Sequence, residues 1–497
     1  MLTRLKIRGF KNMTDVDVRF GPFTCIAGAN GVGKSNLFDA ISFLAALAEK
    51  PLIDAALSVR DEGGRTGDIR TLFHRIGEHY DPEMSFEAEM LVPKSGFDDL
   101  GQSARAATTF LRYSLTLRYR DDKLSPSAGG LEIVKEELSH IKIRDAKKHL
   151  SFTTSQQWLH SVLSGKRTTP FISTDGEHGS TKIMIHQDGT QGRTRQFSAE
   201  NLPRTILSTT NAAEMPTTTL ARREMQSWQL LQLEPTAMRS PDSFTAAAHL
   251  SSDGRHLPAT LYRMARVATE SNNPEPSSHT NPIYAQVANR LSELIDDVGE
   301  LHISRDEKRE LLTLFVSGKD GTAHPARALS DGTLRFLALA VLNIDQDSQG
   351  LLCLEEPENG IHPLRIPAIL NLLEGIAVDT EDSVSPENPL RQVIINTHSP
   401  SVVAQVNEDS LLLAESMTLK SDLGISYRAL SFSCLQKTWR AELTGARIIA
   451  RGKVMEYLNP VSPSDMHSYD DTPLTKPPCR KRVMDRDDLQ MTLAYDE

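Results

Sequence analysis

One run of eight residues combines glycines, a lysine and a serine at a spacing that suits phosphate binding. The run reads Gly28-Ala29-Asn30-Gly31-Val32-Gly33-Lys34-Ser35. Glycines let backbone N–H groups crowd around a phosphate without side-chain clash, and a helix that begins here points its positive end at the same anion. Lys34 is expected to bridge the β- and γ-phosphates of a nucleotide, and the Ser35 hydroxyl to ligate Mg²⁺. The residues expected to bind the nucleotide are Asn30, Gly31, Gly33, Lys34, Ser35 and Asn36.

A pair of adjacent carboxylates follows a short apolar run in the second half of the chain. Residues 350–356 read Gly-Leu-Leu-Cys-Leu-Glu-Glu, a pattern typical of a buried parallel strand that ends in acids. Ligands of α/β sheets bind at the carboxyl ends of the strands. We therefore expect Glu355 to hold Mg²⁺ and Glu356 to polarise the attacking water. A plain acidic loop after a core strand is the alternative, and the presence of the phosphate loop makes it less favoured.

Two further segments place polar residues at the end of an expected strand or at the start of an expected helix. The apolar run at residues 392–396 leads into Thr397 and His398, and a histidine at a strand end can donate one hydrogen bond to a γ-phosphate. Ser330 and Gly332 open a helical pattern that extends to about residue 342. Ser330 can cap that helix, and the free N–H groups of its first turn form an anion site. Capping of this kind is common and carries no functional weight by itself.

Composition limits the class of protein. The chain has 497 residues, long enough for two to four domains. Its net charge of −10 makes indiscriminate binding to nucleic acid unfavourable. No run of 18 apolar residues suggests a membrane span, and the first residues lack the apolar core of a signal peptide. The four cysteines are scattered without metal-ligand spacing, so we expect a cytoplasmic protein with reduced thiols and no membrane association.

Hydrophobic periodicity places the motifs on elements. Alternation over residues 2–20 predicts an antiparallel hairpin, followed by the strand at 23–27 and a helix at 36–47. The α/β rhythm returns from residue 309 onward. Between these regions the pattern predicts strands at 84–92, 110–120 and 131–143, loops around 93–108, 121–130 and 164–200, helices at 217–232, 257–269 and 282–298, and a linker at 272–280.

Taken in this order, the motifs resemble those of ABC-type ATPases in the branch that includes RecF, SMC heads and OLD nucleases. Residues 28–35 match Walker A, Glu355 and Glu356 match Walker B, and His398 matches the switch histidine. Residues 330–332 resemble the signature motif, residues 357–363 the D-loop, and residues 7–12 the first strand. The resemblance covers roughly residues 1–48 and 309–415, and the middle of the chain carries no motif that we can place.

The resemblance implies an α/β fold: an ABC-ATPase head with a mixed sheet, an antiparallel β subdomain and a helical signature subdomain, interrupted by a mixed α+β insertion. With the composition of the remaining segments, we expect the following domains: an N-terminal lobe at 1–92, the insertion at 93–300, a C-terminal lobe with signature, Walker B and switch histidine at 301–415, and a C-terminal extension at 416–458. The prolines and mixed charge of residues 459–497 predict a disordered or partner-docking tail.

The resemblance also implies how ATP and Mg²⁺ are used. In this family two heads form a head-to-tail homodimer around two ATP molecules, so Ser330 and Gly332 would contact a partner's γ-phosphate, while Glu356 and His398 act in catalysis. Walker B usually places aspartate where this chain has Glu355. Because Mg²⁺ tolerates poor geometry badly, the longer side chain favours slow hydrolysis and tight holding of ATP.

Within the branch, the chain lacks the heptad repeats of SMC proteins and the C-terminal Toprim motifs of OLD nucleases. It is most similar to stand-alone ATPase subunits of bacterial anti-phage systems such as Septu or PARIS, which pair with a separate nuclease or Toprim effector. A RecF-like ATPase of DNA repair is the alternative, with DNA as a ligand; a toxin–antitoxin or transport accessory ATPase is a third reading. Basic clusters that a DNA-binding protein would use are Lys142, Arg144, Lys147, Lys148 and His149, and Arg480 to Arg482 in the tail, although such clusters are more often solvated surface.

Overall fold

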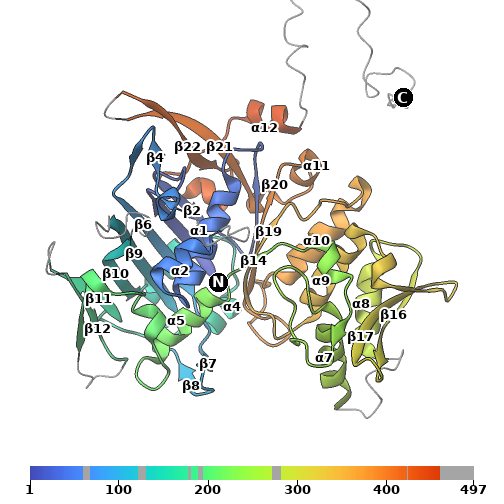
Figure 1. The fold of residues 1–497 in the computed structure, drawn as a ribbon. Helices are drawn as coiled ribbons and strands as arrows, with labels where there is room; N and C mark the ends of the chain where they lie inside the picture. The colour runs from blue at the N-terminus through green and yellow to red at the C-terminus, as the bar shows by residue number, and fades with distance from the viewer. Residues whose placement is uncertain are drawn as a thin grey trace, which may run out of the picture. The chain divides into compact units, whose positions relative to one another are not determined.

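The computed structural model describes residues 1–59, 68–120, 130–176, 181–188, 194–270, 281–421 and 424–458 (Figure 1). Residues 1–450 form one compact unit, and the remainder is a second unit in which helix α12 (Arg451–Leu458) is described. The linker expected at 272–280 and the tail expected at 459–497 lie outside the described residues, as does the basic cluster in that tail. In the described part of the chain no helix is long and apolar enough to cross a membrane.

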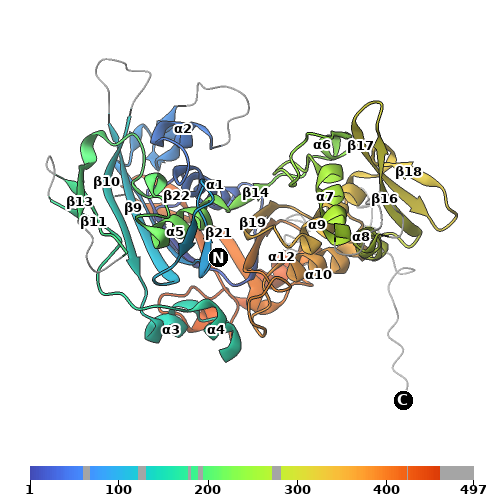
Figure 2. The same ribbon diagram turned by 90° about the horizontal axis from the view of Figure 1, so that it is seen from below.

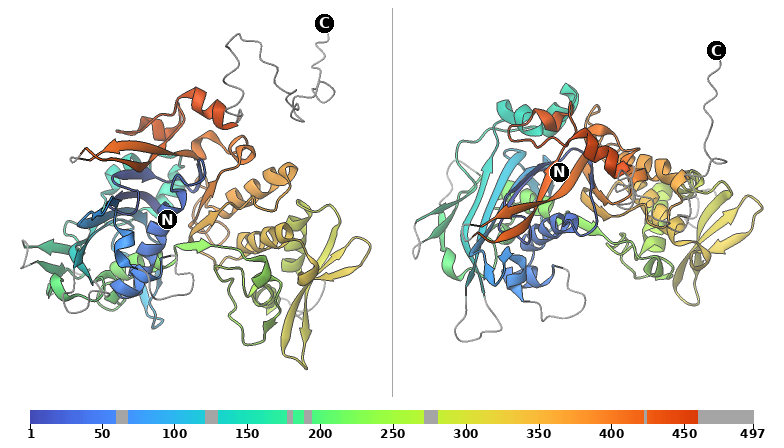
Figure 3. Two further views of the ribbon diagram at one scale, coloured as in Figure 1. Left: turned by 45° about the horizontal axis from the view of Figure 1, so that its top comes forward. Right: turned by 90° about the horizontal axis from the view of Figure 1, so that it is seen from above.

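A six-stranded sheet carries the sequence motifs. Five of its strands are parallel, and the last strand, β22, runs antiparallel to its neighbour. β3 is buried along its whole length, as is typical of a parallel sheet that is covered on both faces. In both views of Figure 3 the blue N-terminal segment lies beside the orange C-terminal strands. The strand order is β14 (Gln229–Leu231), β19 (Gly350–Glu355), β20 (Arg391–Thr397), β3 (Phe23–Ala27), β21 (Leu411–Lys420), β22 (Ser426–Ser433).

An eight-stranded antiparallel sheet forms the β subdomain. Its strand order is β13 (Arg195–Ser198), β12 (Lys182–Ile185), β11 (Ile172–Asp175), β10 (Gly130–His140), β9 (Phe110–Arg120), β6 (Glu83–Leu91), β1 (Leu2–Arg8), β2 (Val16–Arg19). The sheet runs across the boundary that we placed at 92/93, because β9 pairs with β6 along nearly its whole length. The expected hairpin at residues 2–20 is confirmed as β1 and β2.

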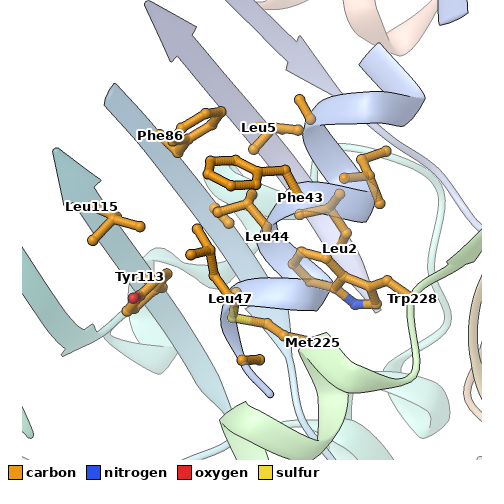
Figure 4. Packing of buried hydrophobic residues seen from close by; sticks show 14 of the residues in the cluster. Leu2, Leu5, Phe43, Leu44, Leu47, Phe86, Tyr113, Leu115, Met225 and Trp228 are labelled. Carbon is orange, nitrogen blue, oxygen red and sulfur yellow. The ribbon is translucent and has the colours of Figure 1, made fainter. Parts of the chain in front are cut away.

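Helix α1 (Lys34–Leu47) packs onto this sheet and forms the largest hydrophobic core. Figure 4 shows Phe43, Leu44 and Leu47 of α1 against Leu2 and Leu5 of β1. The Phe43 ring lies 5.9 Å from that of Phe86 and 6.0 Å from that of Phe10, centroid to centroid. The other side of the same core is closed by Met225 and Trp228, at and just after the end of helix α5 (Pro216–Gln226) (Figure 4). The short helix α2 (Leu52–Leu57) contributes to the same core. The short helices α3 (Ala146–Leu150) and α4 (Gln156–Val162) belong to a second cluster of buried residues, together with Met1 and Phe110.

A third group of elements bears the signature turn. Helices α7 (Leu257–Glu270), α8 (Pro282–Ser292) and α9 (Asp331–Ile344) pack beside a four-stranded sheet (Figures 1 and 2). The strands of that sheet are β15 (Asp242–Ser243), β17 (Leu311–Gly318), β16 (Val298–Asp306) and β18 (Ala323–Pro325). Helix α10 (Ile366–Ile376) packs on α9 and β20. The remaining elements are α6 (Pro235–Met238), α11 (Pro400–Val403), and the hairpins β4 (Arg75–Ile76) with β5 (His79–Tyr80) and β7 (Ser95–Phe97) with β8 (Ser103–Arg105).

Several expected boundaries were wrong. The helix expected at 217–232 ends at Gln226, because the next residues form β14 and pair with β19. The helix expected at 282–298 ends at Ser292, and β16 begins at Val298. The loops expected at 93–108 and 164–200 contain the short strands β7, β8, β11, β12 and β13. β7 and β13 are largely exposed, and each of these strands has only three or four residues, too few for a clear alternation. The strand at 110–120 and the helix at 257–269 are confirmed.

A buried carboxyl group anchors the loop that follows the β subdomain. Glu136 on β10 is fully buried and accepts hydrogen bonds from the backbone N–H groups of Ile206 at 2.8 Å and Leu207 at 2.9 Å. The Tyr113 hydroxyl adds a third at 3.2 Å. Burial raises the pKa of Glu136 to about 7 against the opposing effect of these donors. The group therefore stays partly protonated at a pH where an exposed glutamate is ionised.

The raised pKa of Glu136 predicts a pH-dependent stability. Between the unfolded pKa of about 4.3 and the folded pKa of about 7 the folded state binds more protons, so stability falls as pH rises through this window. Glu136→Gln keeps the neutral form at every pH. We expect the stability of this variant, relative to wild type, to increase from pH 5 to pH 8, measured by urea unfolding. A difference that is constant across this range would contradict the assignment.

Candidate functional site

The phosphate loop adopts a backbone that requires glycine at two positions. It connects the end of β3 to α1, with Gly31 at φ +75° and Gly33 at φ +102°. L-residues rarely adopt this left-handed region. A Cβ atom on Gly33 would lie 2.2 Å from the Asn12 side-chain nitrogen. Asn30 and Gly31 are exposed at the tip, whereas Lys34, Ser35 and Asn36 form the first turn of α1.

Lys34 folds back onto this loop. Its Nζ donates hydrogen bonds to the carbonyl oxygens of Gly28 at 2.7 Å and Ala29 at 3.0 Å. Burial lowers the pKa of Lys34, while the charges of Glu356, Glu355 and Glu358 oppose that shift. The ammonium group is thus held under the loop, in a field set by three nearby carboxyl groups.

Strand register brings the distant motifs to one edge of the sheet. Glu355 pairs with Asn396 across β19 and β20, and Thr397 pairs with Ala27 across β20 and β3. The Gly28 N–H donates to the Thr397 carbonyl at 3.3 Å, so the loop begins where β20 ends. Carboxyl ends of parallel strands meet at one edge, and the six-stranded sheet therefore places the phosphate loop, Glu355 and His398 side by side.

Glu356 has an unusual backbone and a well-held side chain. Its φ of +47° lies in the left-handed region, which is costly for a non-glycine residue and is concentrated at functional sites. One carboxylate oxygen lies 2.5 Å from His398 Nδ1, and the other accepts from the Asn359 amide at 2.9 Å. Partial burial opposes ionisation, but the hydrogen bonds from Asn359 and His398 and the charge of Lys34 outweigh it and lower the pKa of Glu356.

A third carboxyl group lies deeper in the same edge. Glu358 is buried and accepts a hydrogen bond from the Thr397 hydroxyl. Burial raises the pKa of Glu358, and the nearby charge of Glu356 adds to that effect. Glu358 and Thr397 therefore connect the segment after β19 to the end of β20 beneath the more exposed Glu356–His398 pair.

The signature turn lies at the start of α9. Ser330 caps the helix, accepting a hydrogen bond from the Thr333 N–H at 3.2 Å, and both Ser330 and Asp331 are exposed. Gly332 is buried against the D-loop: a Cβ atom there would lie 2.4 Å from the Gly360 carbonyl oxygen. The outer side of this helix N-terminus thus faces solvent, and its inner side packs on the segment that follows Glu356.

Asn12 supports the phosphate loop and was missed by the sequence analysis as a site residue. Its side-chain amide donates to the Val32 carbonyl at 3.0 Å, and its oxygen accepts from the Asn36 side chain at 2.8 Å. Asn36, expected to contact the nucleotide, is therefore hydrogen-bonded to Asn12. The only sequence signal for Asn12 was its place in the stretch at residues 7–12. Its contacts with Val32 and Asn36 could not be predicted, because they join two turns that are separated along the chain.

Of the expected site residues, the structure brings Lys34, Glu355, Glu356 and His398 together at one edge. Gly332 lies instead against Gly360 and Ile361, and Ser330 is the exposed residue that caps the same helix. The internal basic cluster occupies the segment before and within α3, where Lys142, Arg144, Lys147 and Lys148 are exposed and His149 lies 2.8 Å from the buried carboxylate of Glu89. Those four exposed side chains are as expected of a solvated surface.

The phosphate loop after a parallel strand, with carboxylates at the end of a neighbouring strand, is the arrangement of a nucleotide-binding P-loop domain. A family model described as "AAA domain, putative AbiEii toxin, Type IV TA system" matches residues 23–96 and 186–404. These stretches make up more than half of the chain, and the chain belongs to this family.

Individual proteins match less extensively. DNA replication and repair protein RecF of Magnetococcus marinus is 53% identical over 45 residues, which cover 9% of this chain and 12% of that protein. Among solved structures, an SMC head bound to the C-terminal winged-helix domain of ScpA aligns with 88% of this chain and 99% of that chain, at 13% identity and a TM-score of 0.45. The SMC head domain from Thermotoga maritima covers the same shares at 10% identity and a TM-score of 0.34. The two structural similarities carry no functional argument, which depends instead on the family and the site.

The geometry of the phosphate loop predicts unequal effects of two substitutions. Gly31→Ala has open space around the new Cβ atom and loses only the left-handed preference, about 1–2 kcal/mol. Gly33→Ala has the same backbone cost and also displaces Asn12. We expect a larger loss of unfolding free energy for Gly33→Ala, partly restored by Asn12→Ala in the double variant. Equal losses for the two glycine variants in urea unfolding would contradict the role of Asn12.

Proposed function

We propose that this protein binds and hydrolyses ATP between two copies arranged head to tail, and that the closed dimer controls a separately encoded nuclease or Toprim-type effector in bacterial anti-phage defence. The observation that carries the enzymatic part is the convergence of Lys34, Glu355, Glu356 and His398 at one sheet edge.

The residues at this edge fit ATP with Mg²⁺. The turn from Gly31 to Gly33 suits a phosphate cradle, and Lys34 supplies a cation beneath it. Ser35 and Glu355 provide the oxygen ligands that Mg²⁺ prefers, and the ion would neutralise charge on the phosphates. Glu356 orients and polarises the attacking water, and His398 fixes the Glu356 carboxylate through their hydrogen bond. The remaining neutralisation comes from the other copy, whose exposed Ser330 turn is an open helix N-terminus.

The cellular part of the proposal rests on the resemblance to stand-alone ATPase subunits of anti-phage systems. The family description names a putative toxin and a type IV toxin–antitoxin system, which favours the third reading, a toxin–antitoxin ATPase. The alternative, a RecF-like ATPase that acts on DNA, is favoured by the 45-residue match to RecF. A nuclease or Toprim gene beside this one supports the defence role, and a replication operon supports the alternative. DNA-stimulated ATP hydrolysis with gapped duplex would also favour the RecF-like function.

The head-to-tail arrangement predicts a change in assembly. ATP with Mg²⁺ should raise the dimer fraction, because half of each site lies on the other copy in this arrangement. Sedimentation velocity with a slowly hydrolysed ATP analogue measures the change. Lys34→Ala should abolish nucleotide binding and stay monomeric, since it removes the ammonium group under the phosphates, whereas Lys50→Ala, at an exposed position after α1, should behave as wild type. A nucleotide-independent monomer in the wild-type protein would refute head-to-tail closure.

A substitution of Glu356 separates nucleotide binding from hydrolysis. Glu356→Gln keeps the size of the side chain but removes the carboxylate, so kcat should fall about 10²- to 10⁴-fold. ATP should remain bound and the dimer should persist. Phosphate release in single-turnover and steady-state assays measures the loss, and normal release from this variant would show that Glu356 is not the group that activates water.

A further inference from the structure

An acidic side chain lies in the signature turn. Asp331 is the first residue of α9 and directly follows the capping residue Ser330, and both residues are exposed. A carboxylate at this position suits the helix, because the N-terminal end of a helix attracts negative charge. It does not suit a phosphate that approaches the same helix end, because the two anions repel each other. The sequence of the turn therefore opposes the ligand that its free N–H groups would otherwise attract.

Arg239 compensates the charge of Asp331. It follows α6, a short helix that packs on α9. Its Nη2 donates hydrogen bonds to Asp331 Oδ1 at 2.5 Å and to the Leu329 carbonyl oxygen at 3.0 Å. These two acceptors flank Ser330 on either side along the chain. The guanidinium group, which stays protonated at any physiological pH, is therefore held at the signature turn itself.

The stability of the fold does not account for this cation. The side chain of Arg239 is 29% exposed and that of Asp331 is 59% exposed, and ion pairs with this exposure contribute little to stability. Helix α9 already has a hydrogen-bonded cap at Ser330. A positive charge near the N-terminus of a helix is unfavourable for the helix. Arg239 thus brings to the turn a charge that α9 does not favour and that a bound polyanion does.

We propose that Arg239 neutralises Asp331 and thereby makes the signature turn of one copy receptive to the γ-phosphate of the nucleotide held by the other copy. The inference rests on the proposed function and assigns a role in it to a residue outside the Walker, signature and switch motifs. With the ion pair intact, the turn carries no net negative charge. Without Arg239, the Asp331 carboxylate opposes closure of the dimer around ATP.

A charge-removing variant tests this role. Arg239→Gln keeps an amide that can donate to the Leu329 carbonyl but leaves Asp331 unneutralised. With Mg²⁺ and a slowly hydrolysed ATP analogue, the dimer dissociation constant measured by sedimentation should rise about tenfold or more, because like charges placed across an interface are strongly unfavourable. Binding of ADP to the monomer, measured by calorimetry, should stay within about twofold of wild type, since Arg239 lies outside the phosphate loop of its own chain.

A second substitution separates charge from backbone support. Asp331→Asn removes the carboxylate, so Arg239→Gln/Asp331→Asn should dimerise with a dissociation constant within about threefold of wild type, because the two charges act as a pair. Raising the ionic strength should also narrow the gap between Arg239→Gln and wild type, since salt screens the repulsion at an exposed site. If Arg239 only supported the backbone at Leu329, the double variant would stay as weak as Arg239→Gln at every salt concentration, and that result would overturn the proposal.

The control is Arg309→Gln, at an exposed arginine between β16 and β17 that pairs with Asp306. It removes the same charge elsewhere on the surface and should dimerise as wild type does. Thermal unfolding of every variant checks that the fold is retained.

These measurements also separate the inference from the function on which it rests. A wild-type protein that stays monomeric with the ATP analogue would refute both. A wild-type protein that dimerises, together with an Arg239→Gln variant that dimerises equally well, would refute only the role of Arg239.

Discussion

The parallel register of β3, β19 and β20 is the constraint on which the site depends. Each strand carries one motif at or just past its carboxyl end. The pairings of Glu355 with Asn396 and of Thr397 with Ala27 fix the positions of these motifs relative to one another along the strand direction. Register in a sheet is discrete: a slip by one residue turns every side chain to the other face. A buried polar side chain on β20 opposes that slip, because Gln392 donates to the carbonyl oxygens of Leu2 at 2.7 Å and Gly21 at 2.8 Å, and a slip would leave these buried groups unpaired. The core therefore determines the geometry of the chemistry at its edge.

The charges at this edge of the sheet favour a polyanion that binds together with a cation over a polyanion that binds alone. Three carboxyl groups, Glu355, Glu356 and Glu358, act on one buried ammonium group, Lys34. Bringing phosphates alone towards these acids is unfavourable in the low dielectric of a closed site. A divalent cation reverses the sign of that interaction. The burial of Lys34 also means that its charge is weakly screened by solvent, which strengthens its attraction for a phosphate.

The sequence allowed the motif-bearing elements to be predicted because their apolar runs and glycine turns are local signals. Helix α1, strand β9, strand β19 and the cap at Ser330 follow from such signals. The predicted C-terminal end of α5 was wrong because the residues that follow it form β14, a strand that exists only through its pairing with β19. Pairing between distant segments gives no pattern in the local sequence. Contacts made by Asn12 and Asn359 escaped prediction for the same reason: each joins segments that only the fold brings together. The left-handed backbone of Glu356 is likewise a product of its neighbours, since the residue type does not favour it.

The position of β3 in its sheet has a consequence for biosynthesis. Both of its hydrogen-bonded neighbours, β20 and β21, come from the last part of the compact unit. The antiparallel pairs β1–β2 and β1–β6 can form while the ribosome is still translating the insertion, but β3 must wait for residues 391–413 before either edge is covered. Such long sequence separation slows folding and leaves an unpaired apolar strand exposed to aggregation. A nascent chain of this protein therefore cannot complete the sheet that carries the phosphate loop until residues 391–413 have been synthesised.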